Sequence, residues 1–249
     1  DKGRLGFAIQ LKFMQLHGRF PERHDEIDPD ATQWLAVQLG TTTEALSSYE
    51  LNGRQGQRHQ RTIRVFLGYR PATGEDLKQL NQWLCSDALP FDPQARHGRD
   101  LALDWCRIHH LEPPASEELN RTIRSAVRSY EAQQQALIFS RLSANSKAAI
   151  NRLLGEDDTD ADETDNENAT TISFSSLKTD PCKASLDSLL VAIAKLKCID
   201  EIGLAAEVFK DVPTKFIDQF RQRCSTESIR ELRRHPVAIR YSMVAMFCW

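Results

Sequence analysis

The chain has 249 residues, of which 41% are hydrophobic and 27% charged, and its net charge is −3. This composition is that of a soluble globular protein with room for two or three domains. Glycine and proline are sparse and long amphipathic stretches predominate, so we predict an all-α fold of tandem small helical domains. The most apolar stretch, residues 237–249, is too short to span a bilayer, which needs about 20 residues, so we expect no membrane association.

Four helices are predicted within residues 1–70, which form the first expected domain. The apolar spacing indicates helices at about 4–17, 28–39, 43–49 and 57–67. The second of these begins at Asp28-Pro29, a capping residue followed by proline in the first turn, and it stops at Gly40.

Two further helical domains are expected downstream. The second domain, residues 71–155, is predicted to contain helices at about 75–88, 94–110, 116–142 and 144–154. The third, residues 172–249, is predicted to contain helices at about 185–199, 204–210, 213–224, 226–234 and 237–249. The chain lacks a starting methionine and stops on an apolar run, so we expect a fragment whose third domain is truncated at its C-terminus.

An acidic segment separates the second and third domains and accounts for the negative net charge. Residues 156–167 contain eight acids and no base, and removing eight negative charges from −3 leaves +5. We predict that residues 156–171 are a disordered linker, because they hold too few apolar side chains to offset the cost of ordering. The charge of the remaining segments is therefore compatible with a nucleic-acid partner.

Residues 32–49 have the pattern of a helix-turn-helix. Ala36 is the small residue needed where two helices cross, and Gly40 can take the positive φ of the turn. The apolar residues expected in the shared core are Leu35, Leu39, Leu46 and Tyr49. A plain helical hairpin that ends at a glycine explains the pattern equally well.

The next segment is strongly basic. Residues 51–70 contain five arginines and one histidine but no acid. On a helical wheel Arg58, Arg61 and Arg64 share one face, and the opposite, buried face is expected to hold Ile63, Phe66 and Leu67. A solvated helix usually mixes charge signs, so an acid-free stripe favours a phosphate partner or guanine edges over a merely solvated face. The candidate DNA-binding residues of this first domain are Thr42, Thr43, Arg54, Arg58, His59, Arg61, Arg64 and Arg70.

Two later segments repeat the basic pattern more weakly. The helix expected from residue 116 has Arg121, Arg124 and Arg128 on its outer face, but glutamates flank them, so DNA contact and ordinary surface exposure both stay open. Near the C-terminus Glu227 and Glu231 alternate with arginines, which favours surface ion pairs over DNA contact.

No motif for catalysis or for metal binding occurs in the chain. It has no glycine-rich phosphate loop, no HExxH sequence and no serine of the nucleophile-elbow kind. We therefore expect no catalytic residue, no metal ligand, no cofactor and no small-molecule substrate in this fragment. The six cysteines form no CxxC pair, which predicts buried reduced thiols in a cytoplasmic protein.

A series of short motifs runs in order along nearly the whole chain, apart from the acidic segment. They include Arg4-Leu5-Gly6-Phe7-Ala8, Gly18-Arg19-Phe20-Pro21, Trp34-Leu35-Ala36, Arg58-His59, Glu112-Pro113-Pro114, Ile193-Ala194-Lys195-Leu196 and Leu232-Arg233-Arg234-His235-Pro236. This ordered set resembles the N-terminal region of bacterial replicative transposases of the Tn-three family.

The resemblance implies sequence-specific binding of terminal inverted repeats by N-terminal helical DNA-binding domains during DNA transposition. It also implies that a DDE catalytic domain, which uses magnesium, lies beyond Trp249, so none of its acids is assigned here. The full-length protein would then be an enzyme and a possible dimer. The alternative is a helical interaction scaffold in which the basic stripe docks an acidic protein.

Overall fold

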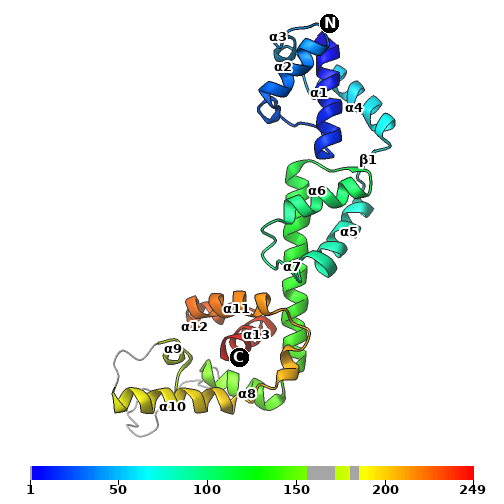
Figure 1. Cartoon of the computed structure of the whole chain (residues 1–249). Coiled ribbons are helices and arrows are strands. Elements are labelled where there is room, and N and C mark those ends of the chain that lie inside the picture. The colour runs from blue at the N-terminus through cyan, green and yellow to red at the C-terminus, as the bar shows by residue number, and fades with distance from the viewer. Residues whose placement is uncertain (1, 156–171, 180–184) are drawn as a thin grey trace. The chain divides into compact units, whose positions relative to one another are not determined.

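The computed structural model describes residues 2–155, 172–179 and 185–249, and helices make up most of them (Figure 1). The predicted all-α fold is confirmed. The chain divides into two compact units, which are described separately. Unit 1 comprises residues 1–89 and 94–127, and unit 2 comprises residues 90–93 and 128–249.

Unit 1 contains four successive α-helices and a short 3-10 helix, followed by a second helical group. Its first part consists of α1 (Lys2–His17), η1 (His24–Glu26), α2 (Pro29–Gln38), α3 (Glu44–Ser47) and α4 (Arg54–Leu67). Its second part consists of β1 (Arg70–Pro71), α5 (Gly74–Trp83), η2 (Leu84–Ala88), α6 (Gly98–Ile108), β2 (Leu111–Glu112) and the beginning of α7 (Ser116–Arg141). Each helix predicted between residues 4 and 142 has a counterpart.

Helix α1 is the centre of the first part, and α2, α3 and α4 pack around it (Figure 1). Leu5 and Ile9 of α1 join Leu35, Ala36 and Tyr49 in one buried cluster, against which Leu39 and Leu46 also pack. The core predicted for residues 32–49 is thus confirmed. Gly40 adopts a left-handed φ of +63° at the end of α2, as its place in the turn requires.

Several contacts join the two parts of unit 1, among them a pair of short strands, an ion pair and a hydrogen bond at the start of α7. The two-residue strands β1 and β2 pair in parallel, with Arg70 opposite Leu111. Arg64 at the end of α4 forms an ion pair with Glu112, at 2.5 Å between Nη1 and Oε2. The backbone N–H of Ser116, which starts α7, donates a hydrogen bond to the Glu22 carboxylate at 3.3 Å.

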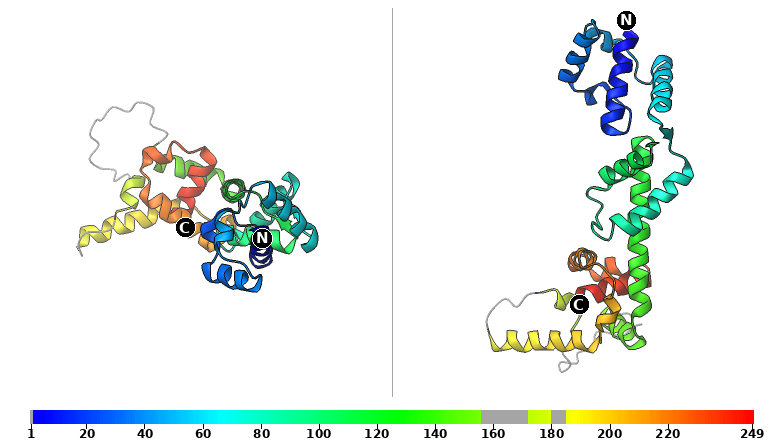
Figure 2. Two further views of the ribbon diagram at one scale, coloured as in Figure 1. Left: turned by 90° about the horizontal axis from the view of Figure 1, so that it is seen from above. Right: turned by 45° about the vertical axis from the view of Figure 1, so that its right-hand side comes forward.

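Unit 2 is built around α13 (Val237–Cys248), whose residues 241–246 are all buried. It also contains the end of α7, α8 (Ala144–Leu153), α9 (Phe174–Leu177), α10 (Leu186–Glu201), η3 (Ala206–Phe209), α11 (Thr214–Thr226) and α12 (Ile229–Leu232). Phe216 and Phe220 of α11 are fully buried beside α13. Helix α10 differs, since none of its residues is buried and it extends away from the rest of the unit in each view (Figure 2).

The predicted division into domains stays a prediction. The expected boundary after residue 70 lies inside unit 1, and the expected linker at 156–171 lies outside the described residues.

Of the cysteines, Cys106 and Cys224 are buried, and Cys85, Cys198 and Cys248 are partly exposed; all five are free thiols. Within the described ranges no helix combines the length and the apolar character needed to cross a membrane.

Candidate nucleic-acid interface

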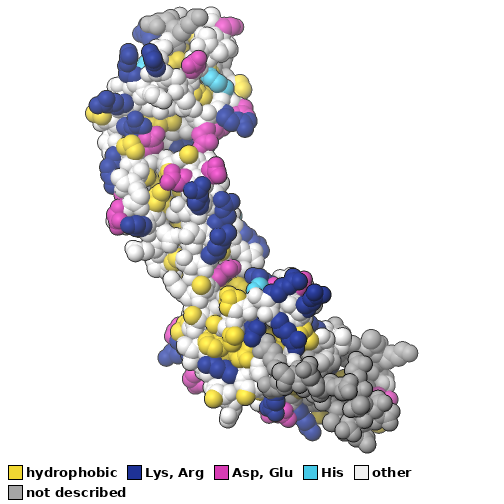
Figure 3. Space-filling model, turned by 180° about the vertical axis from the view of Figure 1, so that it is seen from behind, with side chains coloured by type: hydrophobic (Ala, Val, Ile, Leu, Met, Phe, Trp, Pro, Cys, Tyr) yellow, Lys and Arg dark blue, Asp and Glu magenta, His cyan; other side chains and the backbone are white. Residues whose placement is uncertain are grey.

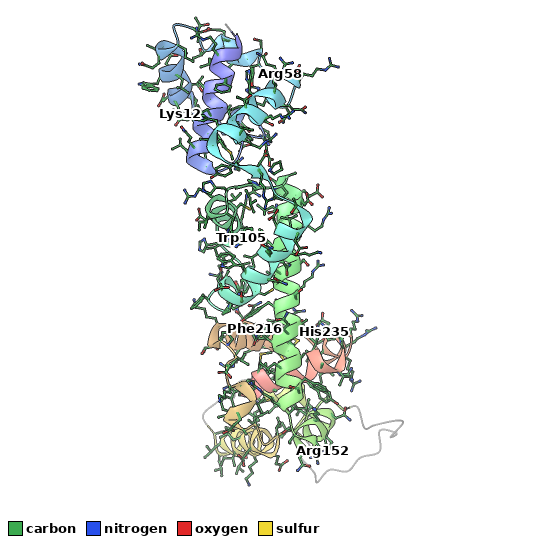
Figure 4. The ribbon with its side chains drawn as sticks, turned by 90° about the vertical axis from the view of Figure 1, so that its right-hand side faces the viewer. Lys12, Arg58, Trp105, Arg152, Phe216 and His235 are labelled. Carbon is green, nitrogen blue, oxygen red and sulfur yellow. The ribbon has the colours of Figure 1, made fainter. Side chains whose placement is uncertain are left out.

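The outer face of α4 presents three arginines at helical spacing. Arg54, Arg58 and Arg61 follow one another at i, i+4 and i+7, so they lie in one row along the helix, and all three are exposed. Helix α4 contains no acid, and none of the three forms an ion pair with another described residue. Figure 4 shows Arg58 extending from α4 into open space. We call this row the α4 arginine face.

Two apolar side chains border the α4 arginine face. Val65 is 79% exposed and continues the row at i+11 from Arg54, and Phe66 beside it is 73% exposed. The prediction that Phe66 lies in the core was wrong. Each residue turns the helix by about 100°, so the buried stripe through Ile63 and Leu67 leaves Phe66 on its edge, where no neighbouring element covers it.

Arg64 is not part of the open face. Its side chain is only 22% exposed, because its guanidinium forms the ion pair with Glu112 and lies 6.0 Å from the centre of the Phe20 ring. A pair of this kind fixes the end of α4 against the loop before α7. Its loss would leave a half-buried carboxylate without its partner.

Arg70 is also held by the protein. Both of its terminal nitrogens donate to the Asp76 carboxylate, at 2.6 and 2.7 Å. The same carboxylate accepts the Thr73 backbone N–H at 2.8 Å and closes a capping box at the start of α5. Arg70 and these Thr73 hydrogen bonds hold the pKa of Asp76 well below its usual range. Arg70 therefore serves the fold, and its assignment to DNA contact stays a prediction.

His59 lies on the flank of α4 and turns toward α1. Its Nδ1 is 2.8 Å from the Tyr49 hydroxyl, and its ring meets the edge of Phe7 at 5.2 Å between centroids. Burial, and secondarily the charge of Arg58, lower the pKa of His59. His59 is thus a neutral side chain in the wall of a cavity, and it does not extend the row of positive charges.

The helix-turn-helix predicted at residues 32–49 is only partly recognisable. Helix α2 and the turn at Gly40 are present, but the second helix, α3, spans four residues. Thr42 and Thr43 lie directly before it, with Thr42 exposed and Thr43 partly exposed. A single turn is too short to act as a groove-reading helix, so the long helix after it, α4, is the better candidate.

A second candidate surface lies between α5 and the beginning of α7. A groove of about 530 Å³ is lined there by Lys78, Asn81, Gln82, Arg121 and Thr122, among others. These are donors and acceptors of the kind that contact phosphates and base edges. Arg121 lies 3.9 Å from Glu117, a weak exposed pair.

The other two predicted arginines of α7 are exposed and form no ion pair within the described part of the chain. Arg124 belongs to unit 1, next to the groove in sequence, and Arg128 is the first α7 residue of unit 2. Whether either contacts DNA stays a prediction.

The arginines of unit 2 are largely paired, in line with their alternation with glutamates. Arg223 and His235 both contact Glu227, at 2.7 and 2.9 Å. Arg233 donates to the carbonyls of Leu154 and Gly155 and so caps the end of α8. Arg230 and Arg234 are exposed. Figure 3 shows a group of Lys and Arg side chains beside a histidine on one face of the molecule.

The described residues also bear on metal binding. Within these ranges no group of three or more His, Cys, Asp or Glu side chains is arranged to hold a metal ion. The α4 arginine face and the groove between α5 and α7 present arginine and amide side chains, which are suited to binding phosphates and base edges.

Comparison with known families places the chain in one of them. No curated protein matches the chain. One family model, described as a domain of unknown function (DUF4158), matches residues 1–126, which is just over half of the chain and nearly all of unit 1. The match includes both the α4 arginine face and the groove between α5 and α7. The chain therefore belongs to the DUF4158 family.

Proposed function

We propose that this chain binds double-stranded DNA through the α4 arginine face, as the N-terminal DNA-binding part of a transposase that recognises terminal inverted repeats. The observation that carries the proposal is the row Arg54, Arg58 and Arg61, which is exposed, unpaired within the described residues and free of acids along its helix. The resemblance to Tn-three family transposases supplies the biological setting.

The dimensions of α4 suit a DNA groove. An α-helix with its side chains is about 10–12 Å in diameter, so the major groove, about 12 Å wide, admits it. Arg54 and Arg61 are seven residues apart, which spreads the row over about 10 Å along the axis. Arginine binds phosphates and the O6 and N7 atoms of guanine through two parallel N–H donors. Val65, on the same row, offers an apolar contact of the type made with thymine methyl groups.

The groove between α5 and α7 gives unit 1 a second DNA-binding surface in this proposal. The exposed Gln82 carries an amide group of the kind that pairs with adenine, and Lys78 and Arg121 supply charge for phosphates. Two surfaces within one unit would contact a longer stretch of DNA than α4 alone.

The alternative function is docking of an acidic protein partner. The exposed Phe66 beside the arginines favours it, because aromatic residues together with arginine are enriched in protein interfaces. A competition experiment distinguishes the two functions, because it shows whether DNA or an acidic protein displaces a labelled duplex from the α4 arginine face. Unlabelled duplex DNA should displace a labelled duplex completely under the first, whereas a purified acidic peptide should displace it only through bulk charge.

The salt dependence of duplex binding tests the proposal. Each phosphate contact adds roughly 0.9 to the negative slope of log K against log salt. All five arginines between residues 54 and 70 would account for roughly 4.5, but Arg64 and Arg70 are paired internally, so the α4 arginine face accounts for roughly 2.7. We expect a total slope of at least this size by fluorescence anisotropy, and an affinity independent of salt would contradict DNA binding.

A further inference from the structure

A cavity of about 390 Å³ opens between α1 and the flank of α4. Its lining contains two kinds of side chain. Phe7, Ala8 and Leu39 are apolar, whereas Arg4, Gln55 and His59 carry N–H donors, and no acid is among the lining residues. A ligand that fits this lining has a negatively charged end and an apolar side.

The hydrogen bond between Tyr49 and His59 bears on which ring nitrogen of His59 can donate to a ligand in the cavity. Desolvation raises the pKa of Tyr49 to about 12, so its hydroxyl keeps its proton and can donate it to Nδ1 of His59. The pKa of His59 is lowered, chiefly by burial, so the ring is neutral at pH 7. Assigning the Tyr49 hydroxyl as the donor and Nδ1 as the acceptor places the single ring proton of His59 on Nε2, which is then a donor.

The surrounding packing holds this donor in place. The Tyr49 ring lies so close to Gly6 of α1 that a Cβ at Gly6 would fall 2.6 Å from ring carbons. Phe7 meets the His59 ring edge-on at an interplanar angle of 85°. The imidazole is therefore fixed between two aromatic residues, and the flexible side chains of Arg4 and Gln55 complete the set of donors.

We propose that this cavity binds one sugar–phosphate unit of the DNA backbone. The phosphate accepts hydrogen bonds from Arg4, Gln55 and Nε2 of His59, and the deoxyribose packs on the apolar side chains. Gln55 and His59 belong to α4 and alternate in sequence with Arg54 and Arg58, so the cavity lies directly beside the α4 arginine face. The proposal rests on DNA binding by that face and adds the contact that sets the register of α4 on the duplex.

Two variants test the cavity by different means. Arg4→Gln removes one exposed charge, and Ala8→Leu fills the cavity without changing charge. In fluorescence anisotropy with a duplex at 0.1 M salt, each is expected to weaken binding by about eightfold and to lower the salt slope by roughly 0.9. The matched control is Lys12→Gln, an exposed cation of α1 that does not line the cavity, which should leave the slope unchanged (Figure 4).

The outcomes separate this proposal from DNA binding itself. If wild-type protein binds duplex with the expected slope while Arg4→Gln and Ala8→Leu behave like Lys12→Gln, the cavity proposal is overturned and the proposed function stands. If the wild type binds no duplex, both fail. A titration with inorganic phosphate tests whether the cavity binds a free phosphate ion in place of a phosphate of the DNA backbone. Saturable, millimolar binding seen at the His59 imidazole resonances, and lost in Arg4→Gln, would instead assign the cavity to free phosphate.

Discussion

Replacing Arg54, Arg58 and Arg61 together by alanine is expected to weaken duplex binding by two to three orders of magnitude at 0.1 M salt. Three phosphate contacts contribute roughly 2.7 to the salt slope. A slope of this size makes the binding constant at 0.1 M salt about 500 times that at 1 M salt. All three side chains are exposed on a helix that packs through its opposite side, so the fold should persist. Anisotropy titrations over a range of salt concentrations measure both quantities.

A charge-matched variant controls for the loss of three positive charges. Lys197, Lys210 and Arg230 are exposed in unit 2, outside the proposed interface, and their triple alanine variant has the same net charge. It should bind duplex within about threefold of wild type, because these three side chains belong neither to the α4 arginine face nor to the groove between α5 and α7. Equal losses in the two triple variants would mean that only net charge matters, and the α4 arginine face would lose its special role.

Replacing Gly56 by alanine is expected to destabilise the protein by about 2–3 kcal/mol. A Cβ at this buried position of α4 would fall 2.0 Å from the Leu51 carbonyl oxygen and 2.6 Å from that of Glu50. The Leu51 carbonyl cannot easily move, because it accepts hydrogen bonds from the side-chain amides of Gln10 and Gln60, at 3.1 and 3.3 Å. The cost of overpacking therefore exceeds the gain of about 1 kcal/mol that alanine brings to a helix.

Urea unfolding followed by circular dichroism measures the effect at Gly56. Gly74→Ala is the matched control, because Gly74 also lies in a helix of unit 1 but a Cβ there would meet nothing within 4 Å. That variant should be neutral or slightly stabilising. A Gly56→Ala protein as stable as wild type would show that the start of α4 can shift away from the Leu51 turn.

Local sequence signals predicted the helices well. Asp28 accepts hydrogen bonds from the N–H groups of Asp30 and Ala31, as expected of a residue that caps a helix before proline. Gly40 and Gly68 end α2 and α4 with positive φ, so both stops could be inferred from the positions of the glycines. Such signals depend only on neighbours in sequence, so the ends of the helices can be predicted without knowledge of the tertiary structure.

The composition of the candidate site could be predicted only in part. Arg64 looks equivalent to Arg58 and Arg61 on a helical wheel, but its partner Glu112 is 48 residues away, and no local pattern indicates that contact. The ion pair between Arg70 and Asp76 could have been predicted, because Thr73 and Asp76 form a recognisable capping box six residues or fewer downstream of Arg70. The spacing of Arg54, Arg58 and Arg61 would have identified the open row directly.

The role of His59 and the cavity beside it depends on packing that no spacing rule describes. Tyr49 reaches His59 only because α1 presents a glycine at Gly6, which lets the ring approach the helix backbone. The sequence shows the glycine but does not show which ring will lie against it. Arg4 and Gln55, which complete the cavity, were missed for the same reason.

Chemical footprinting tests the central claim most directly. Duplexes selected from a randomised pool by wild-type protein would be methylated with dimethyl sulfate, which reacts at N7 of guanine in the major groove. We expect a short protected patch of guanines that disappears when Arg54, Arg58 and Arg61 are changed to alanine, because arginines in the major groove cover N7. An identical patch with the triple variant, or selection that enriches no sequence at all, would contradict the assignment of DNA recognition to α4.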